Sequence, residues 1–369
     1  MVKHPFDFVA FGGLSMGEGH TLVLKNDRTV WGTGANAFGQ LGISTMRSTR
    51  STNFVEVMSG GKAVAAGSEH SMVLKEDGSV WSAGRNLCGQ LGDGSNLDSE
   101  IFVQVIPSDA NAVAAGAEHS LLVMRDGSMW STGSNIHGQL GDGSGDDMSK
   151  FSKVIATGVH AISAGSVHSI MLKQDGSVWV TGKNDRGQLG DGSTEPKFSF
   201  VQVMSSGATG VAAGSRHSMV MKQDGTVWVT GDNEHGQLGD GTTNHKIRFV
   251  QVVSSGSKAI AAGDGHSIVM KEDGSVWATG RNNFGQLGDG PMTFRCTFAH
   301  VISSASQAVA AGDWHSMVLT QDGRLWATGS NLYGQLGDGS MISKNKYEAV
   351  FFLRNGMFRV RIQCRSSAA

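Results

Sequence analysis

Histidine is the commonest protein ligand for metal ions, and this sequence carries seven histidines spaced 49 or 50 residues apart. They are His20, His70, His119, His168, His217, His266 and His315. If each histidine lies in its own sheet, a shared ion is excluded, because packed sheets lie about 10 Å apart and zinc needs ligands about 2 Å away. We expect each histidine to be hydrogen-bonded inside its own repeat, where it fixes a turn, and we expect no metal and no cofactor.

Three further sequence patterns resemble motifs of catalytic or ligand-binding sites. The run from Gly84 to Leu91 has the glycine spacing of a phosphate-binding loop but lacks the following Lys and Ser/Thr. The run from Gly13 to Gly17 matches a nucleophile elbow around Ser15, yet it falls where the other copies have a first strand. The Gly-Asp-Gly-Ser runs lack the alternating acidic ligands of a calcium loop. The sequence therefore predicts no catalytic residue.

Each histidine belongs to a longer repeat, of which Ala63 to Ser95 is one copy. A tryptophan follows each histidine by 11 residues, at Trp31, Trp81, Trp130, Trp179, Trp228, Trp277 and Trp326. A Gly-Gln-Leu-Gly motif also follows, with its glutamine at Gln40, Gln90, Gln139, Gln188, Gln237, Gln286 and Gln335. Internal repetition at a fixed period is typical of propellers and solenoids. We predict that the tryptophans fill the blade core. The glutamines, Asn86 and its six counterparts are expected to hydrogen-bond the backbone of turns.

One copy contains four short strand-like runs. They are Val64 to Gly67, His70 to Lys75, Ser79 to Gly84 and Phe102 to Ile106. The Asp77-Gly78 turn is a hairpin signal that recurs in every copy but the first, which has Asp27-Arg28. Four strands and their turns leave no room for a helix. The prediction is an all-β, seven-bladed propeller of four-stranded antiparallel blades, and the alternative is an open solenoid with polar caps.

The ends suggest a closed ring. Phe6 to Val9 is an eighth candidate for the seven outer-strand positions, so one terminus is expected to complete a blade begun by the other. We predict one propeller over residues 1–350, with blade cores near 14–57, 64–105, 113–154, 162–203, 211–252, 260–301 and 309–350. Residues 351–369 are expected to form a hairpin or tail that turns at Asn355-Gly356, with Arg359 and Arg361 on one face.

Composition predicts an intracellular protein. The three cysteines, Cys88, Cys296 and Cys364, share no metal-ligand spacing, which is typical of a reducing compartment. No stretch resembles a signal peptide or a membrane span. The cytosol or nucleus is expected. The net charge of −2 predicts no strong overall attraction to nucleic acid or membrane.

The pattern Ala-Ala-Gly-x-x-His-Ser, then Asp-Gly-x-Val-Trp, then Gly-x-Asn-x-x-Gly-Gln-Leu-Gly resembles the repeat of the regulator of chromosome condensation superfamily over residues 6–350. The resemblance implies a seven-bladed propeller. It also implies possible roles as a guanine nucleotide exchange factor for a small GTPase and as a chromatin-docking protein, but fold alone does not establish function. The family's exchange factor uses a wedge beside the ring, and the uniform 49-residue spacing offers no insertion for one.

Positions that vary between copies are where a partner could be recognised. The turn between strands one and two and the loop between strands three and four lie at one end of an antiparallel blade, opposite the Asp-Gly turns. The variable residues of these two segments predict a partner-binding surface on that face. Its candidate residues are Trp314, Asp313, Asp264, Arg216, His137, Arg186, His235, Phe284 and Tyr333.

The loops after each Gly-Asp-Gly carry an asymmetric charge. Basic residues form an expected arc over blades five, six, seven and one, made of Arg47, Arg50, His245, Lys246, Arg248, Arg295, Lys344 and Lys346. Acidic residues face it in blades two and three, at Asp98, Glu100, Asp146 and Asp147. One interpretation is scatter of solvated charges, and the other is a site for an acidic partner such as chromatin or nucleic acid.

The leading hypothesis is a non-enzymatic scaffold that binds a protein through the variable loop face. The alternative, which only the resemblance implies, is guanine nucleotide exchange on a small GTPase.

Overall fold

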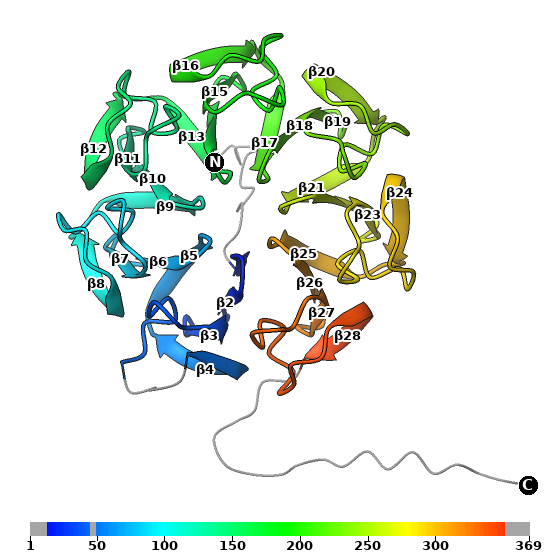
Figure 1. The fold of residues 1–369 in the computed structure, drawn as a ribbon, viewed down its shortest axis with the longest axis horizontal. Helices are drawn as coiled ribbons and strands as arrows, with labels where there is room; N and C mark the ends of the chain where they lie inside the picture. Colours follow the sequence, from blue (N-terminus) through cyan, green and yellow to red (C-terminus); the bar gives the residue numbers. More distant parts are fainter. Residues whose placement is uncertain (1–12, 45–48, 351–369) are drawn as a thin grey trace, which may run out of the picture.

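The computed structural model describes residues 13–44 and 49–350, which form a ring of seven four-stranded antiparallel sheets (Figure 1). In each sheet the first strand lies nearest the axis and the fourth lies at the outer edge. The all-β class and the seven-bladed propeller are therefore confirmed. The described part of the chain contains no helix, and so no helix that could cross a membrane.

Blade two shows how the repeat folds. Its strands are β5 (Gly61–Ala66), β6 (His70–Lys75), β7 (Val80–Gly84) and β8 (Ser99–Ile106). Five of the six residues of β6 are buried, because this strand packs against a neighbouring blade on each of its faces. Strands that are apolar on both faces are therefore explained by their place between two sheets.

The other six blades repeat this order. Blade one has β1 (Leu14–Met16), β2 (His20–Leu24), β3 (Val30–Ala35) and β4 (Arg50–Met58). Blade three has β9 (Ala110–Ala115), β10 (His119–Met124), β11 (Met129–Gly133) and β12 (Met148–Ile155), and blade four has β13 (Val159–Ala164), β14 (His168–Lys173), β15 (Val178–Gly182) and β16 (Lys197–Met204). Blade five has β17 (Ala208–Ala213), β18 (His217–Lys222), β19 (Val227–Gly231) and β20 (Lys246–Val253). Blade six has β21 (Ser257–Ala262), β22 (His266–Lys271), β23 (Val276–Gly280) and β24 (Arg295–Ile302), and blade seven has β25 (Ser306–Ala311), β26 (His315–Thr320), β27 (Leu325–Gly329) and β28 (Lys344–Val350).

The Asp-Gly turns connect the second and third strands, as predicted. The Asp77 carboxylate accepts hydrogen bonds from the Ser79 backbone N–H at 2.8 Å and from its hydroxyl at 2.6 Å. Gly78 has φ 84°, which suits glycine. In blade one Arg28 takes this place with φ 69°, although Asp27 still holds Thr29. The aspartate therefore fixes the turn in the blade that lacks the glycine.

The repeat histidines link neighbouring blades. His70 Nε2 lies 2.8 Å from the hydroxyl of Ser120 in the next blade, and that hydroxyl donates to the Gln90 carbonyl at 2.8 Å. Equivalent bonds join His20 to Ser71, His119 to Ser169, His168 to Ser218, His217 to Ser267, His266 to Ser316 and His315 to Thr21. The prediction of a bond inside each blade was wrong, because the partner hydroxyl belongs to the following blade. We call these seven histidine–hydroxyl–carbonyl chains the inter-blade frame.

Burial keeps the seven histidines neutral. Each hydroxyl hydrogen is used on a glutamine carbonyl, so each histidine donates from Nε2 and its Nδ1 keeps a lone pair. The seven Nδ1 atoms are buried without a hydrogen-bond partner among the described residues. Burial lowers the pKa of His70 to about 3 and that of His20 to about 4, and the other five lie in the same range.

The seven in-register tryptophans are only half-buried, so they do not fill the blade core as predicted, although Trp31, Trp81, Trp130 and Trp179 pack against its buried clusters. The Trp81 indole N–H donates to the Ser79 hydroxyl at 3.0 Å, which holds the ring beside the Asp-Gly turn. The Lys75 ammonium lies 4.6 Å from the centre of the same ring. The tryptophans therefore sit at the turn end of the blades, with one side open to solvent.

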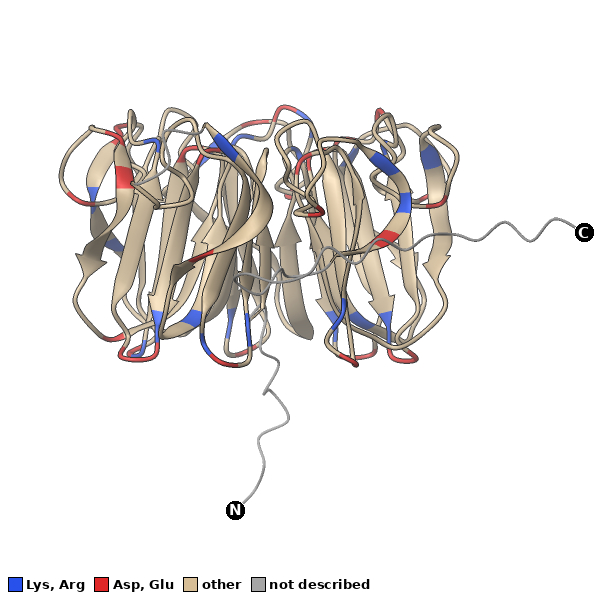
Figure 2. Cartoon of the chain, turned by 90° about the horizontal axis from the view of Figure 1, so that it is seen from below, with Lys and Arg blue, Asp and Glu red and all other residues tan. Residues whose placement is uncertain are grey.

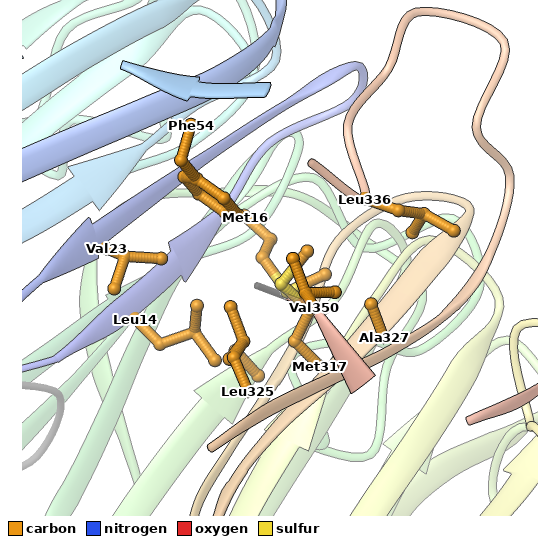
Figure 3. Close-up of a cluster of buried hydrophobic side chains, with 10 residues drawn as sticks. Leu14, Met16, Val23, Phe54, Met317, Leu325, Ala327, Leu336 and Val350 are labelled. Carbon is orange, nitrogen blue, oxygen red and sulfur yellow. The ribbon is translucent and has the colours of Figure 1, made fainter. Parts of the chain in front are cut away.

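Blades one and seven meet without exchanging a strand. Each described sheet takes its four strands from one continuous segment, which differs from the predicted closure by pairing of the termini, and Phe6 to Val9 lies outside the described residues. The His315–Thr21 bond and a backbone bridge between Asn53 and Asp338 cross this boundary. A shared apolar cluster fills it (Figure 3), made of Leu14, Met16, Val23 and Phe54 with Ala310, Met317, Leu325, Ala327, Leu336 and Val350. The ring is thus closed by the same kind of contacts that join the other blades.

Candidate interaction surface

The two variable segments of each blade lie together at one end of the propeller, as predicted. Arg85, at the start of the loop after β7, donates its backbone N–H to the Glu69 carbonyl in the turn before β6 at 2.9 Å. Arg281 makes the same bond to Gly265 at 2.7 Å. We call this end the loop face, and the end with the Asp-Gly turns the turn face. The longer loops gather at the upper end of the ring in Figure 2.

The centre of the loop face is small and acidic on one side. The Ala-Gly pairs that end the first strands line a cavity of about 60 Å³ on the axis, together with Asp313. Burial, followed by the charges of Asp264 and Glu18, raises the pKa of Asp313 to about 7. Burial also raises the pKa of Glu18, with Glu69 and Asp264 contributing. This side of the opening therefore disfavours further negative charge.

A cluster around Arg281 brings four predicted residues together. The guanidinium pairs with Asp264 at 2.8 Å, donates to His235 Nε2, and lies 5.0 Å from the centre of the Trp314 ring. Phe284 meets Trp314 edge-on, with ring centres 5.4 Å apart. Burial, followed by the charge of Arg281, lowers the pKa of His235. We call these five residues, which come from blades five, six and seven, the Arg281 cluster.

Tyr333 lies on the other side of Trp314's blade, over blade one. A Cβ added at Gly19 would lie 2.9 Å from the Tyr333 ring, so this glycine makes room for the aromatic side chain. Tyr333 keeps 46% of its surface exposed. It is therefore available on the loop face but does not belong to the Arg281 cluster.

Arg281 itself was missed by the sequence analysis. It occupies the variable position of the Gly-x-Asn motif, which holds Ala35, Arg85, Ser134, Lys183, Asp232, Arg281 and Ser330 in the seven blades. Arg85 repeats the arrangement in blade two, where it pairs with Glu69 and lies 5.3 Å from the Phe38 ring centre. The residue at this position differs between the seven copies, and this variation is the sequence signal that could have identified both arginines.

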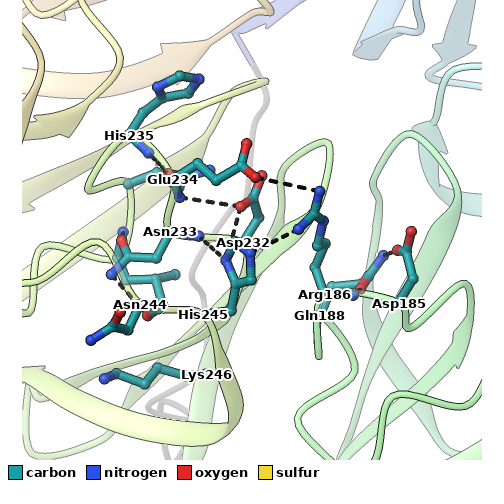
Figure 4. Close-up of polar contacts among 12 residues, drawn as sticks. Asp185, Arg186, Gln188, Asp232, Asn233, Glu234, His235, Asn244, His245 and Lys246 are labelled. Carbon is teal, nitrogen blue, oxygen red and sulfur yellow. Dashed lines mark hydrogen bonds and ion pairs between the residues drawn. The ribbon is translucent and has the colours of Figure 1, made fainter.

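A second polar network joins blades four and five (Figure 4). Arg186 approaches Glu234 at 3.4 Å and His245 Nε2 at 2.9 Å. His245 Nδ1 accepts the Asn233 backbone N–H at 3.0 Å and lies 3.1 Å from Asp232. Ligand atoms of Asp232, Glu234 and His245 lie within 4.8 Å of one another, as a metal site would require. However, the arginine and the backbone N–H already occupy both histidine nitrogens, so the network is organised as ion pairs and hydrogen bonds.

The remaining two predicted partner-binding residues stand apart from both groups. Arg216 is exposed in the turn before β18. His137 is half-buried in blade three, where burial, followed by the charge of Lys183, lowers its pKa. The nine predicted residues thus share one face but form several local groups rather than one continuous site.

The predicted basic arc is partly neutralised within the propeller. Lys246 pairs with Asp240 at 3.0 Å, Arg295 pairs with Asp289, and Lys344 pairs with Glu348 at 2.9 Å. The aspartates belong to the Gly-Asp-Gly runs, so the first residue of the outer strand is held in place by its own blade. Arg248 and Lys346 are exposed and lie over Gly192 and Gly290 of the preceding blades, whereas Arg50 donates to the Leu332 carbonyl at 3.4 Å. Arg47 lies outside the described residues.

The motifs that suggested catalysis serve structural purposes. The Ser15 hydroxyl accepts the Ala66 backbone N–H of blade two at 2.9 Å, so it links the inner strands of blades one and two. In the Gly-Gln-Leu-Gly motif, the Gln90 side chain accepts the Cys88 N–H at 3.0 Å. Asp93 of a Gly-Asp-Gly run accepts the Ser95 N–H at 2.8 Å. The glutamine and aspartate side chains each close a turn, as predicted for the glutamines and for the Gly-Asp-Gly runs.

Solved propellers of the same architecture superpose on most of the chain. The structure of human WBSCR16 matches with a TM-score of 0.74 at 23% identity, covering 84% of this chain and 87% of that one. Yeast RCC1 (Prp20), solved with Kap60, matches with a TM-score of 0.78 at 19% identity over 86% and 82% of the two chains. Prp20p from Saccharomyces cerevisiae also matches with a TM-score of 0.78, at 18% identity over 89% and 87%. At these identities the likeness shows the fold alone.

Comparison at the sequence level is more specific. No curated protein matches the chain significantly. The model of the RCC1-like domain matches residues 111–369, and the model of the regulator of chromosome condensation (RCC1) repeat matches residues 13–40 and 62–90. The first match alone covers more than half of the sequence. This chain therefore belongs to the RCC1-like domain family of propellers.

Proposed function

We propose that the chain is a non-enzymatic interaction propeller that binds a protein partner through its loop face. The observation that carries the proposal is the Arg281 cluster, in which an arginine and two aromatic rings from neighbouring blades meet on loops. Arginine and tryptophan are the residues most enriched at the energetic centres of protein interfaces. The inter-blade frame does not use any residue of this cluster, so its composition is free to serve recognition.

The alternative is guanine nucleotide exchange on a small GTPase. In its favour is the fold likeness to Prp20p, a protein described together with its binding properties to Gsp1p and histones. Against it is the uniformity of the described loops, since every segment between a third and a fourth strand has 14 residues, as in 85–98. The described residues thus contain no insertion that could act as the wedge expected of an exchange factor.

An acidic partner, such as chromatin or nucleic acid, is a further proposal. It depends on Arg248 and Lys346, which are exposed at the outer edge of blades five and seven. The ion pairs of Lys246, Arg295 and Lys344 reduce the charge available to such a partner. We therefore place this proposal below recognition of a protein through the Arg281 cluster.

An affinity pull-down from nuclear and cytosolic extracts tests the proposed function. The bait proteins are wild type, a Trp314→Ala/Tyr333→Ala variant of the loop face, and a matched Arg324→Ala/Glu272→Ala variant of the turn face. We expect proteins that are recovered with wild type and the turn-face variant but lost with the loop-face variant. Recovery of a small GTPase in its nucleotide-free form would make exchange the leading function, and recovery that ignores both variants would contradict the proposal.

A further inference from the structure

Three blades place an exposed apolar residue at one position of the loop face. At the position after the repeat asparagine, blades two, three and seven have Leu87, Ile136 and Leu332, which are 59%, 64% and 52% exposed. Blades four and five have Asp185 and Glu234 at the same position. Since the backbone is the same in each blade, this difference reflects the side chains alone. Single exposed apolar residues are common, but a contiguous group indicates an interaction site.

The two exposed leucines of blade two belong to one loop, which hydrogen bonds to their carbonyls hold together. The side chain of Asn86 donates to the Leu97 carbonyl at 3.0 Å, and that of Asn96 donates to the Leu87 carbonyl at 2.9 Å, so the two leucines project from one loop. Leu97 is 76% exposed. The next residue, Cys88, reaches Glu118 of blade three at 3.9 Å between sulfur and oxygen.

The same surface continues across blade three. The Glu118 carbonyl accepts the Ser134 N–H at 2.8 Å, at the start of the loop that carries Ile136. Phe198 of blade four, 38% exposed, lies over Gly138 and Gly145 of that same loop. Leu97, Leu87, Ile136 and Phe198 thus follow one another around the rim, and we call this group the apolar rim.

Acidic side chains of blades two and three border the apolar rim. Asp98, Glu100, Glu118, Asp146 and Asp147 make no ion pair with any other residue that the structure describes. The nearby cations are fewer, because Arg85 is paired with Glu69 and Lys150 lies against Gly94 at the outer edge. Blades five and six contrast with this, since Lys246 and Arg281 there each have an acidic partner.

We propose that the apolar rim and its acidic border bind a basic amphipathic segment of a partner protein. Leucine, isoleucine and phenylalanine of the rim would take the apolar side of such a segment, and lysines or arginines on its flanks would face the five carboxylates. The charge complementarity selects a basic partner over an acidic one. The inference rests on the proposed function, because it names the kind of partner that one sector of the loop face accepts.

Fluorescence anisotropy with a labelled synthetic helix of leucine and lysine tests this inference. Two control peptides replace every lysine by glutamate or every leucine by serine. We expect the leucine–lysine helix to bind the full chain at least about tenfold more tightly than either control, and salt to weaken the binding because exposed charges are screened. Equal binding of the glutamate peptide would overturn the proposal.

Variants of the protein locate the site. Leu87→Ser/Ile136→Ser should reduce affinity by about tenfold or more, whereas Ile247→Ser/Met292→Ser, exposed apolar residues of blades five and six, should leave it unchanged. Glu100→Gln/Glu118→Gln/Asp146→Asn should reduce affinity and its salt dependence, and it spares Asp98 and Asp147, which cap the Asn86 and Asn135 N–H groups. Because all these side chains are exposed or half-buried, the variants should melt like wild type.

Two outcomes separate this inference from the proposed function. If removal of residues 351–369 raises the affinity for the peptide, the chain's own C-terminal segment is the occupant and the proposal of a partner is overturned. If cellular partners depend on Trp314 and Tyr333 while the peptide ignores Leu87 and Ile136, the inference fails and the proposed function stands.

Discussion

The inter-blade frame and the loop face are built on the same seven-fold backbone but use it in opposite ways. In the frame the same chemistry recurs in every blade, with a histidine, a hydroxyl and a glutamine carbonyl, as in His168, Ser218 and Gln188. On the loop face equivalent positions hold residues as different as Arg281 and Asp232. The repeated bonds of the frame hold the backbone in place, and loop residues can therefore vary between blades without changing the fold.

Lowering the pH should have the largest effect, because it destabilises the inter-blade frame far more than the loop face. The frame histidines have pKa values of about 3 to 4 when folded, whereas an unfolded histidine titrates near its ordinary value of about 6.5. The unfolded chain therefore binds protons first, and stability that is fully present above about pH 6.5 is lost as the pH falls toward 4. The loss should be on the order of 2 kcal/mol for each histidine at pH 5.

Urea unfolding at pH 7.5 and pH 5 measures this effect. We expect a large fall in the midpoint at pH 5, with several protons taken up on unfolding. An unchanged midpoint would mean that the frame histidines are not the buried neutral groups that hold the blades together.

A single hydroxyl tests the frame at one boundary. Ser218→Ala should lower the free energy of unfolding by about 2–4 kcal/mol, because it leaves the His168 N–H and the Gln188 carbonyl buried without a partner. The chain supplies its own control, since Thr21 performs this role in blade one. Ser218→Thr should therefore lose much less stability than the alanine variant, and equal losses would argue that packing rather than the hydroxyl matters.

Removal of Arg281 should change the loop face and leave the frame intact. We expect Arg281→Ala to lower the free energy of unfolding by about 1–2 kcal/mol, because its ion pair with Asp264 is partly buried, with 22% and 25% of the two side chains exposed. The pKa of His235 should rise toward its ordinary value, because the arginine is one of the causes that lower it. Titration by NMR, with Arg216→Ala as the exposed control, measures the shift, and an unmoved pKa would separate His235 from the cluster.

The smallest expected effect concerns the turns between blades. Blade seven begins after Ala305, a non-glycine residue with φ 65°. Blade five begins after Gly207, which has φ 83° and no atom within 4 Å of the Cβ position that it lacks. Ala305→Gly should relieve strain and raise stability by about 0.5–1 kcal/mol, and Gly207→Ala should lower it by about 1 kcal/mol. Thermal melting measures both, and opposite signs are the expected result.

The repeat made the fold predictable. Strand count, the Asp-Gly turns and the shared end of the variable loops all followed from a 49-residue period that leaves no room for helices. The closure was less accessible, because Phe6 to Val9 resembles an outer strand as closely as the strands that the structure describes. Because the repeats are so similar, the sequence does not show whether His70 bonds to a hydroxyl of its own blade or to one of the next blade.

The site was only partly predictable. Four residues of the Arg281 cluster were named from variation between copies, whereas Arg281 sits one position before the repeat asparagine and was overlooked. The ion pairs of the basic arc depend on side chains that fold back onto aspartates of their own blade, as Lys246 does on Asp240. Residue type and loop position predicted that those cations would face a partner. Residue type also predicted that the tryptophans would fill the blade core, whereas the structure leaves them half-buried.

Hydrogen exchange of the propeller, alone and with a partner recovered by pull-down, tests most directly whether recognition lies on the loop face. Slower exchange is predicted in the loop segments 281–285, 313–314 and 331–334, with no change in the Asp-Gly turns of the turn face. Protection confined to the turn face would contradict the account and assign recognition to the end that carries the tryptophans.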